Sequence, residues 1–215
     1  MLVLTKLIVA HLMGDFLLQP TSWVKEKEVH KSKSIKFYLH FLIHGALVLL
    51  FLWDMGLWPV AVSITLSHAV IDLLKTYSQR PKTTTRWFFL DQFLHLLSIL
   101  VIWSIFFDEN IDFRKFINSQ NIWIYSAGIL IVTQVSAIVL QVILKNWTAE
   151  LNLSKKYSLK KAGKYIGILE RLFVFTFVLL GRWEAIGFLI TAKSVFRFSD
   201  LRRSRDRKLT EYICS

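Results

Sequence analysis

The chain has 215 residues, of which 54% are hydrophobic and only 20% are charged, and its formal net charge is +12. A soluble domain carries roughly 25% charged residues spread over its surface, whereas here the charges are bunched between apolar runs. This pattern excludes an ordinary soluble domain and predicts an all-α polytopic membrane protein, because roughly 20 apolar residues in a helix span a bilayer.

The apolar runs predict six to seven transmembrane helices. Six runs approach the length of a span: Leu2–Gln19, Phe37–Trp53, Trp58–Tyr77, Trp87–Phe107, Ile122–Leu144 and Tyr165–Leu180. A seventh stretch, Ala185–Phe198, is shorter than a full span and contains Lys193, so it predicts either a tilted helix or a re-entrant segment. No internal repeat or low-complexity linker divides the chain, and we therefore expect a single domain over residues 1–215.

The basic residues predict the orientation, because they gather in four segments separated by loops that are poor in Lys and Arg. The segments follow the first run (Lys25, Lys27, Lys31, Lys33, Lys36), surround the end of the third (Lys75, Arg80, Lys82, Arg86), follow the fifth, and form the tail from Arg197. Cytoplasmic loops carry such an excess. All four segments share the cytoplasmic side only if the N-terminus is outside and Ala185–Phe198 crosses the membrane.

This basic face predicts the partners of the protein. Lys and Arg near the inner leaflet attract anionic lipid headgroups, in addition to the contact of the apolar helices with the bilayer itself. No motif indicates a nucleic acid partner, and the sequence leaves the oligomeric state open.

Inside the first four runs, ionisable residues recur in pairs that are four residues apart. The pairs are His11 and Asp15, His40 and His44, His68 and Asp72, and Asp91 and His95. Residues at this spacing lie on one face of a helix. With the orientation above, each pair lies about one to three turns from the cytoplasmic end of its helix, at ~5.4 Å per turn. We therefore expect residues 1–107 to form a four-helix core in which these side chains meet at one depth.

The chemistry of these pairs predicts a metal site. Ionisable groups inside a membrane cost free energy unless they are paired, hydrated or coordinated, and imidazoles with carboxylates suit zinc, manganese or iron. The candidates exceed the four ligands of a closed tetrahedral site. They therefore predict two metal ions, or one ion with carboxylates that orient its histidines. Gln19 and Gln92 border this site and are candidates for orienting roles, although each taken singly is more typical of packing between helices.

The alternative for the same residues is a polar core without a metal. His and Asp side chains also join helices through hydrogen bonds, although such bonds in membranes average only about 0.6 kcal/mol.

Residues 108–215 are expected to supply scaffold helices and a basic cytoplasmic tail. Ile122–Leu144 contains no charged residue, whereas Glu170, Arg171 and Lys193 lie inside the last two apolar stretches. The structural interpretation is an ion pair within one helix and a lysine that extends to the membrane interface. The functional interpretation makes Arg171 and Lys193 a clamp for an anionic substrate, because a guanidinium fork binds phosphate or carboxylate.

At these residues the chain resembles a bacterial integral membrane family catalogued as domain of unknown function 3307. The matching stretches are "AHLMGDFLLQ", "HFLIHG", "SHAVIDLLK", "RWFFLDQFLHLL", "IGILERLFVF" and "AIGFLITAKSVFRF". The resemblance implies a helical protein of the bacterial inner membrane and marks the same His and Asp positions, but it implies no reaction. In that family a further apolar segment follows a stretch like "EYICS", so the resemblance implies either truncation before a last helix or a natural short form.

The leading functional prediction is a membrane-embedded, metal-dependent hydrolase that acts from the cytoplasmic leaflet on a lipid-like or anionic substrate. A divalent metal lowers the pKa of bound water toward about 7, and Asp15 or Asp91 would act as the general base. The sequence contains neither a G-x-S-x-G elbow nor an H-E-x-x-H zinc signature, so no known hydrolase class is indicated.

Three other functions stay open. A transporter for divalent metal or protons would also use His and Asp side chains, although no inverted repeat is visible and all pairs lie on one side of the midplane. A b-type haem protein would use His11, His44, His68 and His95 as axial ligands but leave the aspartates without a role. A structural scaffold would need no chemistry.

Overall fold

The computed structural model describes residues 2–107, 122–150 and 158–195, and all regular secondary structure in these ranges is helical, as predicted. The chain forms two compact units, Met1–Lys164 and Tyr165–Ser215, each of which is described by itself. The single domain over the whole chain stays a prediction. The basic tail expected from Arg197 lies outside the described residues.

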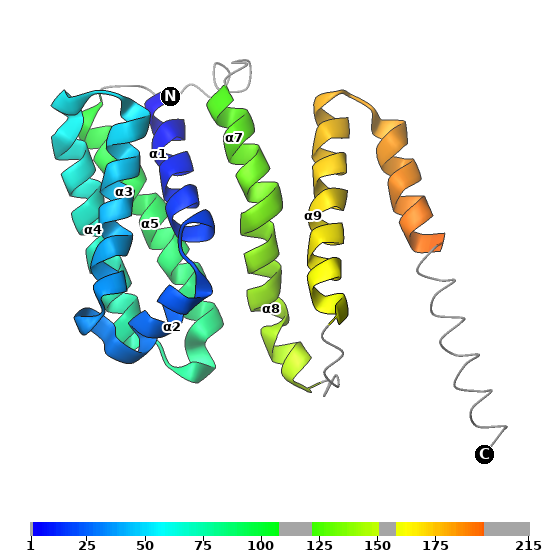
Figure 1. Ribbon diagram of the computed structural model, residues 1–215. Coiled ribbons are helices and arrows are strands. Elements are labelled where there is room, and N and C mark those ends of the chain that lie inside the picture. The colour runs from blue at the N-terminus through cyan, green and yellow to red at the C-terminus, as the bar shows by residue number, and fades with distance from the viewer. Residues whose placement is uncertain (1, 108–121, 151–157, 196–215) are drawn as a thin grey trace. The chain divides into compact units, whose positions relative to one another are not determined.

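Four helices of the first unit pack side by side as a bundle (Figure 1). They are α1 (Leu2–Leu12), α3 (Ile35–Leu52), α4 (Trp58–Ser78) and α5 (Thr84–Phe106). Each contacts two neighbours, in the order α1, α3, α4, α5 and back to α1. The bundle therefore encloses one interior, to which all four of the paired segments contribute.

The first predicted span is broken near its end. After α1 the chain continues as the π-helix η1 (Met13–Leu17), and α2 (Thr21–His30) begins after Pro20. The helical segments before and after this break are bent by 82°, because proline disfavours a helical conformation in the residue before it and lacks the N–H that a continuing helix needs. In Figure 1, α2 lies at the lower end of the bundle, where the sequence analysis expected only a basic segment.

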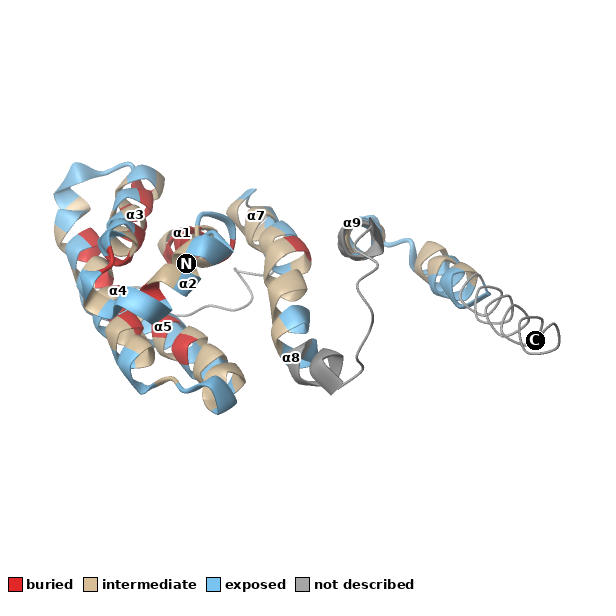
Figure 2. Cartoon of the chain, turned by 60° about the horizontal axis from the view of Figure 1, so that its bottom comes forward, coloured by how far each residue is buried: buried red, intermediate tan, exposed pale blue. Residues whose placement is uncertain are grey.

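The interior of the bundle has an apolar half and a polar half. The apolar half is the core cluster formed by Leu4, Leu7, Ala10, Leu47, Val48, Leu52, Val60, Ala61, Ile64, Ile99, Ile102 and Trp103. Figure 2 shows the buried residues on the faces that the four helices turn toward one another. Large apolar side chains such as Leu42, Phe93 and Ile105 are instead exposed, by 57%, 62% and 72%. An apolar exterior of this extent suits contact with lipid rather than water.

The helices agree with a membrane protein by length and composition. Four of them are long and apolar enough to cross a membrane, or five if the bent pair at the N-terminus is one span. The fifth predicted run is the continuous helical segment α7 (Ile122–Leu130), η5 (Ile131–Val135) and α8 (Ser136–Glu150). Its first part packs against α1.

The last two predicted runs are also helical where the structure describes them. The helix α9 (Ser158–Leu179) leads into the second unit, where residues 183–195 form a further helix. Neither belongs to the segments that are long and apolar enough to cross a membrane. The count of six to seven transmembrane helices and the orientation therefore stay predictions.

Candidate metal centre

All eight ionisable residues that the sequence predicts as ligands lie together in the polar half of the bundle. They form three groups within which one ligand atom per residue lies within 4.8 Å of the others: His11, Asp15, His44 and His68; His40, His68 and Asp72; and Asp15, Asp91 and His95. Asp15 and His68 each belong to two groups. All are buried except Asp15, which is partly buried.

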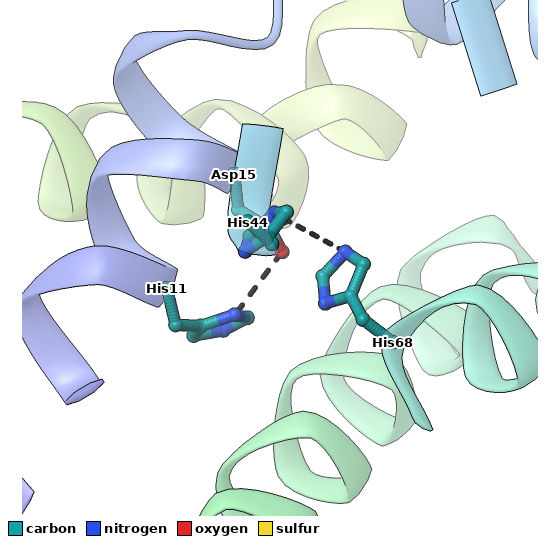
Figure 3. A group of neighbouring side chains, drawn as sticks. All are labelled: His11, Asp15, His44 and His68. Carbon is teal, nitrogen blue, oxygen red and sulfur yellow. Dashed lines mark hydrogen bonds and ion pairs between the residues drawn. The ribbon is translucent and has the colours of Figure 1, made fainter. Parts of the chain in front are cut away.

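The Asp15 carboxylate lies at the centre of the histidines. Its Oδ1 is 3.1 Å from His44 Nε2, 3.2 Å from His40 Nε2 and 3.5 Å from His68 Nε2. Its Oδ2 is 3.9 Å from His11 Nε2. Figure 3 shows His11, His44 and His68 converging on this carboxylate from three different helices. A tetrahedral ion with bonds of about 2.0–2.1 Å holds its ligands about 3.3–3.4 Å apart, so this spacing suits ligands of a common ion.

The imidazole rings are in contact with one another. The ring centroids of His44 and His68 are 3.8 Å apart, and those of His68 and His95 are 3.9 Å apart. His40 Nε2 and His68 Nε2 are separated by 3.1 Å. Two neutral rings form a hydrogen bond at this distance only if one of these nitrogens carries a proton, whereas a shared metal ion would use the lone pairs of both.

Several polar atoms of the cluster have no hydrogen-bond partner within the part of the chain that the structure describes. These atoms are Nδ1 of His11, Nδ1 of His40, both ring nitrogens of His95, and Oδ1 of Asp91. A buried polar atom left without a partner costs about 1–3 kcal/mol. His95 and Asp91 belong to one of the three ligand groups, so an ion bound there would give these atoms a partner. The donor set and its unpartnered atoms thus fit a divalent metal.

Local sequence explains how Asp15 and His44 approach each other so closely. Asp15 lies in the π-helix η1, and single π-turns are frequent at functional sites. A Cβ atom at Gly14 would lie 2.3 Å from His44 Cε1, so any other residue at this position would displace the imidazole. The glycine inside "HLMGD" is a signal that the sequence analysis did not use.

Two lysines bind aspartates of the polar half. Lys27 Nζ donates to Asp72 Oδ2 at 2.6 Å, and Lys75 Nζ donates to Asp91 Oδ2 at 2.7 Å. Among the three aspartates, Asp15 is therefore the one that has no lysine partner within the described residues. In the sequence both lysines predict only the orientation, and no local pattern indicates their contacts with the site.

Gln92 contacts three of the candidate ligands, Asp15, His11 and, through Nε2 at 3.3 Å, Asp91 Oδ2. Its Nε2 donates to Asp15 Oδ2 at 2.7 Å, and its Oε1 lies 3.3 Å from His11 Nε2. A glutamine with these contacts fixes the carboxylate and the imidazole relative to each other, which is the orienting role expected of Gln92. Gln19 does not make a contact of this kind within the described residues; it lies at the edge of a cavity next to the site.

Arg171 and Lys193, the predicted substrate clamp, belong to the second unit. Lys193 Nζ forms an ion pair with Glu170 Oε2, which links α9 to the helix of residues 183–195. The structural interpretation of the sequence placed Glu170 in an ion pair with Arg171, and that pair stays a prediction. The described ion pair of Glu170 is with Lys193. Contact of the clamp with the metal ligands stays a prediction, because the two units are described separately.

The fold and the cluster define the class of the protein. It is an all-helical protein with several apolar helices that could span a membrane, and it has a buried cluster of histidines and aspartates. The chain belongs to the family described as "Protein of unknown function (DUF3307)", whose model matches residues 3–125, and this confirms the resemblance seen in the sequence. The matched residues include all of the four-helix bundle except Leu2. Comparison with curated proteins and with solved structures gives no match.

Proposed function

We propose that this protein is a membrane-embedded, metal-dependent enzyme, a hydrolase that acts on an anionic or lipid-like substrate from the cytoplasmic leaflet of the bacterial inner membrane. The observation that carries the proposal is the convergence of five imidazoles and three carboxylates in three overlapping groups. Because Asp15 is shared between two groups and a carboxylate has two oxygens, the cluster would have room for two ions with Asp15 as their common ligand. Zinc, manganese and iron all accept this donor set.

The proposed orientation places the polar half of the bundle near the cytoplasmic surface and the N-terminus outside. It is supported by α2, which carries Lys25 and Lys27 and is bent away from α1 next to the cluster. A basic segment at this end of the bundle matches the excess of positive charge in cytoplasmic segments.

The residues of the cluster would have different roles in the proposed reaction. When bound, a divalent ion supplies Lewis acidity and a water of lowered pKa. Asp15, surrounded by imidazoles, suits the role of a bridging ligand. The Oδ1 of Asp91 has no hydrogen-bond partner among the described residues, and Lys75 holds the other oxygen. Asp91 therefore suits the role of general base, and Gln92 orients both carboxylates.

The same geometry disfavours the other candidate functions. The centroids of the contacting histidine rings are 3.8–5.7 Å apart, which leaves no space for a haem macrocycle between them. The core cluster at the other end of the bundle is apolar, and an ion pathway through the membrane needs polar groups along its length. Enzymatic chemistry on one side of the membrane needs no such pathway.

Metal analysis of the full chain, purified in detergent, tests the proposal. We expect one to two equivalents of zinc, manganese or iron, which His68→Ala reduces to background because His68 serves two ligand groups. His30→Ala is the matched control, since His30 is exposed on α2 and its removal should leave the metal in place. Absence of metal after expression and titration with each of the three ions would overturn the proposal, and ion flux in proteoliposomes would favour transport instead.

A further inference from the structure

A cavity of about 390 Å³ lies beside the ligand cluster. It is bordered by α2, by the C-terminal part of α4 and by the start of α5. Its lining includes four basic side chains, Lys27, Lys31, Lys75 and Arg80. The size is within the range of small-molecule sites, which begins at about 300 Å³.

The lining combines polar and apolar surface, and its formal charge is positive. Two carboxylates also line the cavity, but Asp72 is paired with Lys27 at 2.6 Å and Glu28 accepts a hydrogen bond from Gln79 Nε2 at 3.0 Å. The four basic groups thus outnumber the two carboxylates, although Lys27 is itself the partner of Asp72. A cavity of this kind attracts an anion with several acceptor oxygens.

The four basic side chains differ in position. Lys27 is buried and Lys75 is partly buried, and each donates one hydrogen to an aspartate, which leaves two of its three ammonium hydrogens for a ligand. Lys31 and Arg80 are exposed and lie at the rim. The Lys31 Nζ atom is 4.9 Å from the centroid of the Tyr77 ring, a cation–π contact that restrains the side chain. Two hydrogen bonds with Thr83 Oγ1, at 3.1 and 3.2 Å, fix the Arg80 backbone.

The cavity borders the proposed metal ligands. Asp72 lines the cavity, and its Oδ2 is 3.7 Å from His40 Nε2. Lys75 also lines the cavity and binds Asp91. An anion held by the lysines would therefore be separated from the ligand cluster by a single layer of side chains.

We propose that this cavity binds the phosphate group of a phosphate-ester substrate, with Lys31 and Arg80 at the rim and Lys27 and Lys75 beneath them. This inference rests on the proposed function, because the bound phosphate group belongs to a substrate only if the protein is a hydrolase. It names phosphate esters as the substrate class of that hydrolase. A phosphate group can belong to a lipid headgroup or to a water-soluble ester, and both offer the same oxygens to the four basic side chains.

Binding to the full chain in phosphatidylcholine nanodiscs tests this site. Inorganic phosphate is titrated by calorimetry, and phosphatidic acid bound per protein is counted by native mass spectrometry. The double variant Lys31→Gln/Arg80→Gln should weaken binding at least about tenfold, since both lost contacts are charge-assisted. The control is Lys33→Gln/Arg86→Gln, which removes the same charge from exposed neighbours outside the lining and should change binding by less than about twofold.

The outcomes separate the possibilities. Equal losses in the two double variants would show a general charge effect and overturn the site, as would unchanged binding in the variant of the lining. Preference for phosphatidic acid would identify a lipid headgroup, and preference for inorganic phosphate a soluble ester; both support the site. Metal content is measured on the same samples. Phosphate bound without metal would contradict the proposed hydrolase and support the anion site. Metal bound without phosphate would contradict the anion site and support the metal-dependent enzyme.

Discussion

The two halves of the bundle are built from the same four helices but differ in kind. In the apolar half, residues such as Val48, Val60 and Ile99 fill the interior. In the polar half, aspartate carboxylates and histidine imidazoles lie together. Several of their atoms have no hydrogen-bond partner within the described residues. Helices in a membrane associate through packing and a few weak hydrogen bonds. The apolar half thus supplies the packing, whereas the polar half supplies the donor groups on which the proposed metal site rests.

The largest expected effect is that of Asp15→Asn in the polar half. The change removes the one carboxylate that contacts four histidines and replaces it with an amide, a much weaker ligand. Bound metal should fall to less than about a tenth of the wild-type value, because even residues that only orient ligands change affinity by about 10–100-fold. Elemental analysis after dialysis measures this.

Asp54→Asn is the control for this substitution. Asp54 is exposed between α3 and α4 and accepts a hydrogen bond from the backbone of Gly56. The Asn variant at this position should retain the metal. If Asp15→Asn also retains full metal content, the central role of this carboxylate is wrong.

The next largest effect is expected for Lys27→Met. Lys27 and Asp72 form an ion pair whose side chains are both 8% exposed, so removal of the lysine leaves a buried charge without its partner. The free energy of unfolding should fall by about 3–5 kcal/mol. Unfolding in detergent with a chelator present measures this without a contribution from bound metal.

A second substitution shows whether the loss comes from the unpaired charge. The double variant Lys27→Met/Asp72→Leu contains no isolated charge and should recover most of the stability, because replacement of a whole buried pair by apolar residues is often neutral. A double variant as unstable as Lys27→Met would instead indicate that the packing of Lys27 is what matters.

The sequence predicts the apolar helices and the convergence of the four pairs because both follow from simple periodicity. Apolar runs set the helices, and a spacing of four directs each pair to one face. The break of the first span was not predicted, although Pro20 marks it. Sequence patterns do not give the 82° angle, which depends on how α2 packs against the end of the bundle.

The contacts of Lys27 and Lys75 with aspartates could not be predicted from the sequence either. Lys27 and Lys75 serve two roles at once, as basic residues near a membrane surface and as partners of buried aspartates. Nothing in the local pattern distinguishes them from Lys25 or Lys33. The contact of Lys27 with Asp72 joins residues 45 positions apart and becomes visible only once α2 is placed.

A smaller effect is expected for Gly14→Ala. The added Cβ would lie 2.3 Å from a ring atom of His44, so the imidazole must move away from Asp15. Metal affinity should fall at least about tenfold, as for other residues that position a ligand, and titration with zinc measures it. Gly187→Ala is the control, since a Cβ there meets no described atom within 4 Å. Equal zinc affinity in the two variants would contradict the close approach.

The smallest effect is expected for Ile64→Val in the apolar half. Ile64 is 4% exposed and precedes His68 by four residues on α4, so it shares a helix face with a proposed ligand. The loss of one methyl group should lower the free energy of unfolding by about 0.5–1.5 kcal/mol and leave metal content unchanged. Chemical unfolding and elemental analysis of the same sample test both parts. Loss of metal from this variant would mean that packing in the apolar half controls the ligand geometry, and the two halves would then have to be treated as one cooperative site.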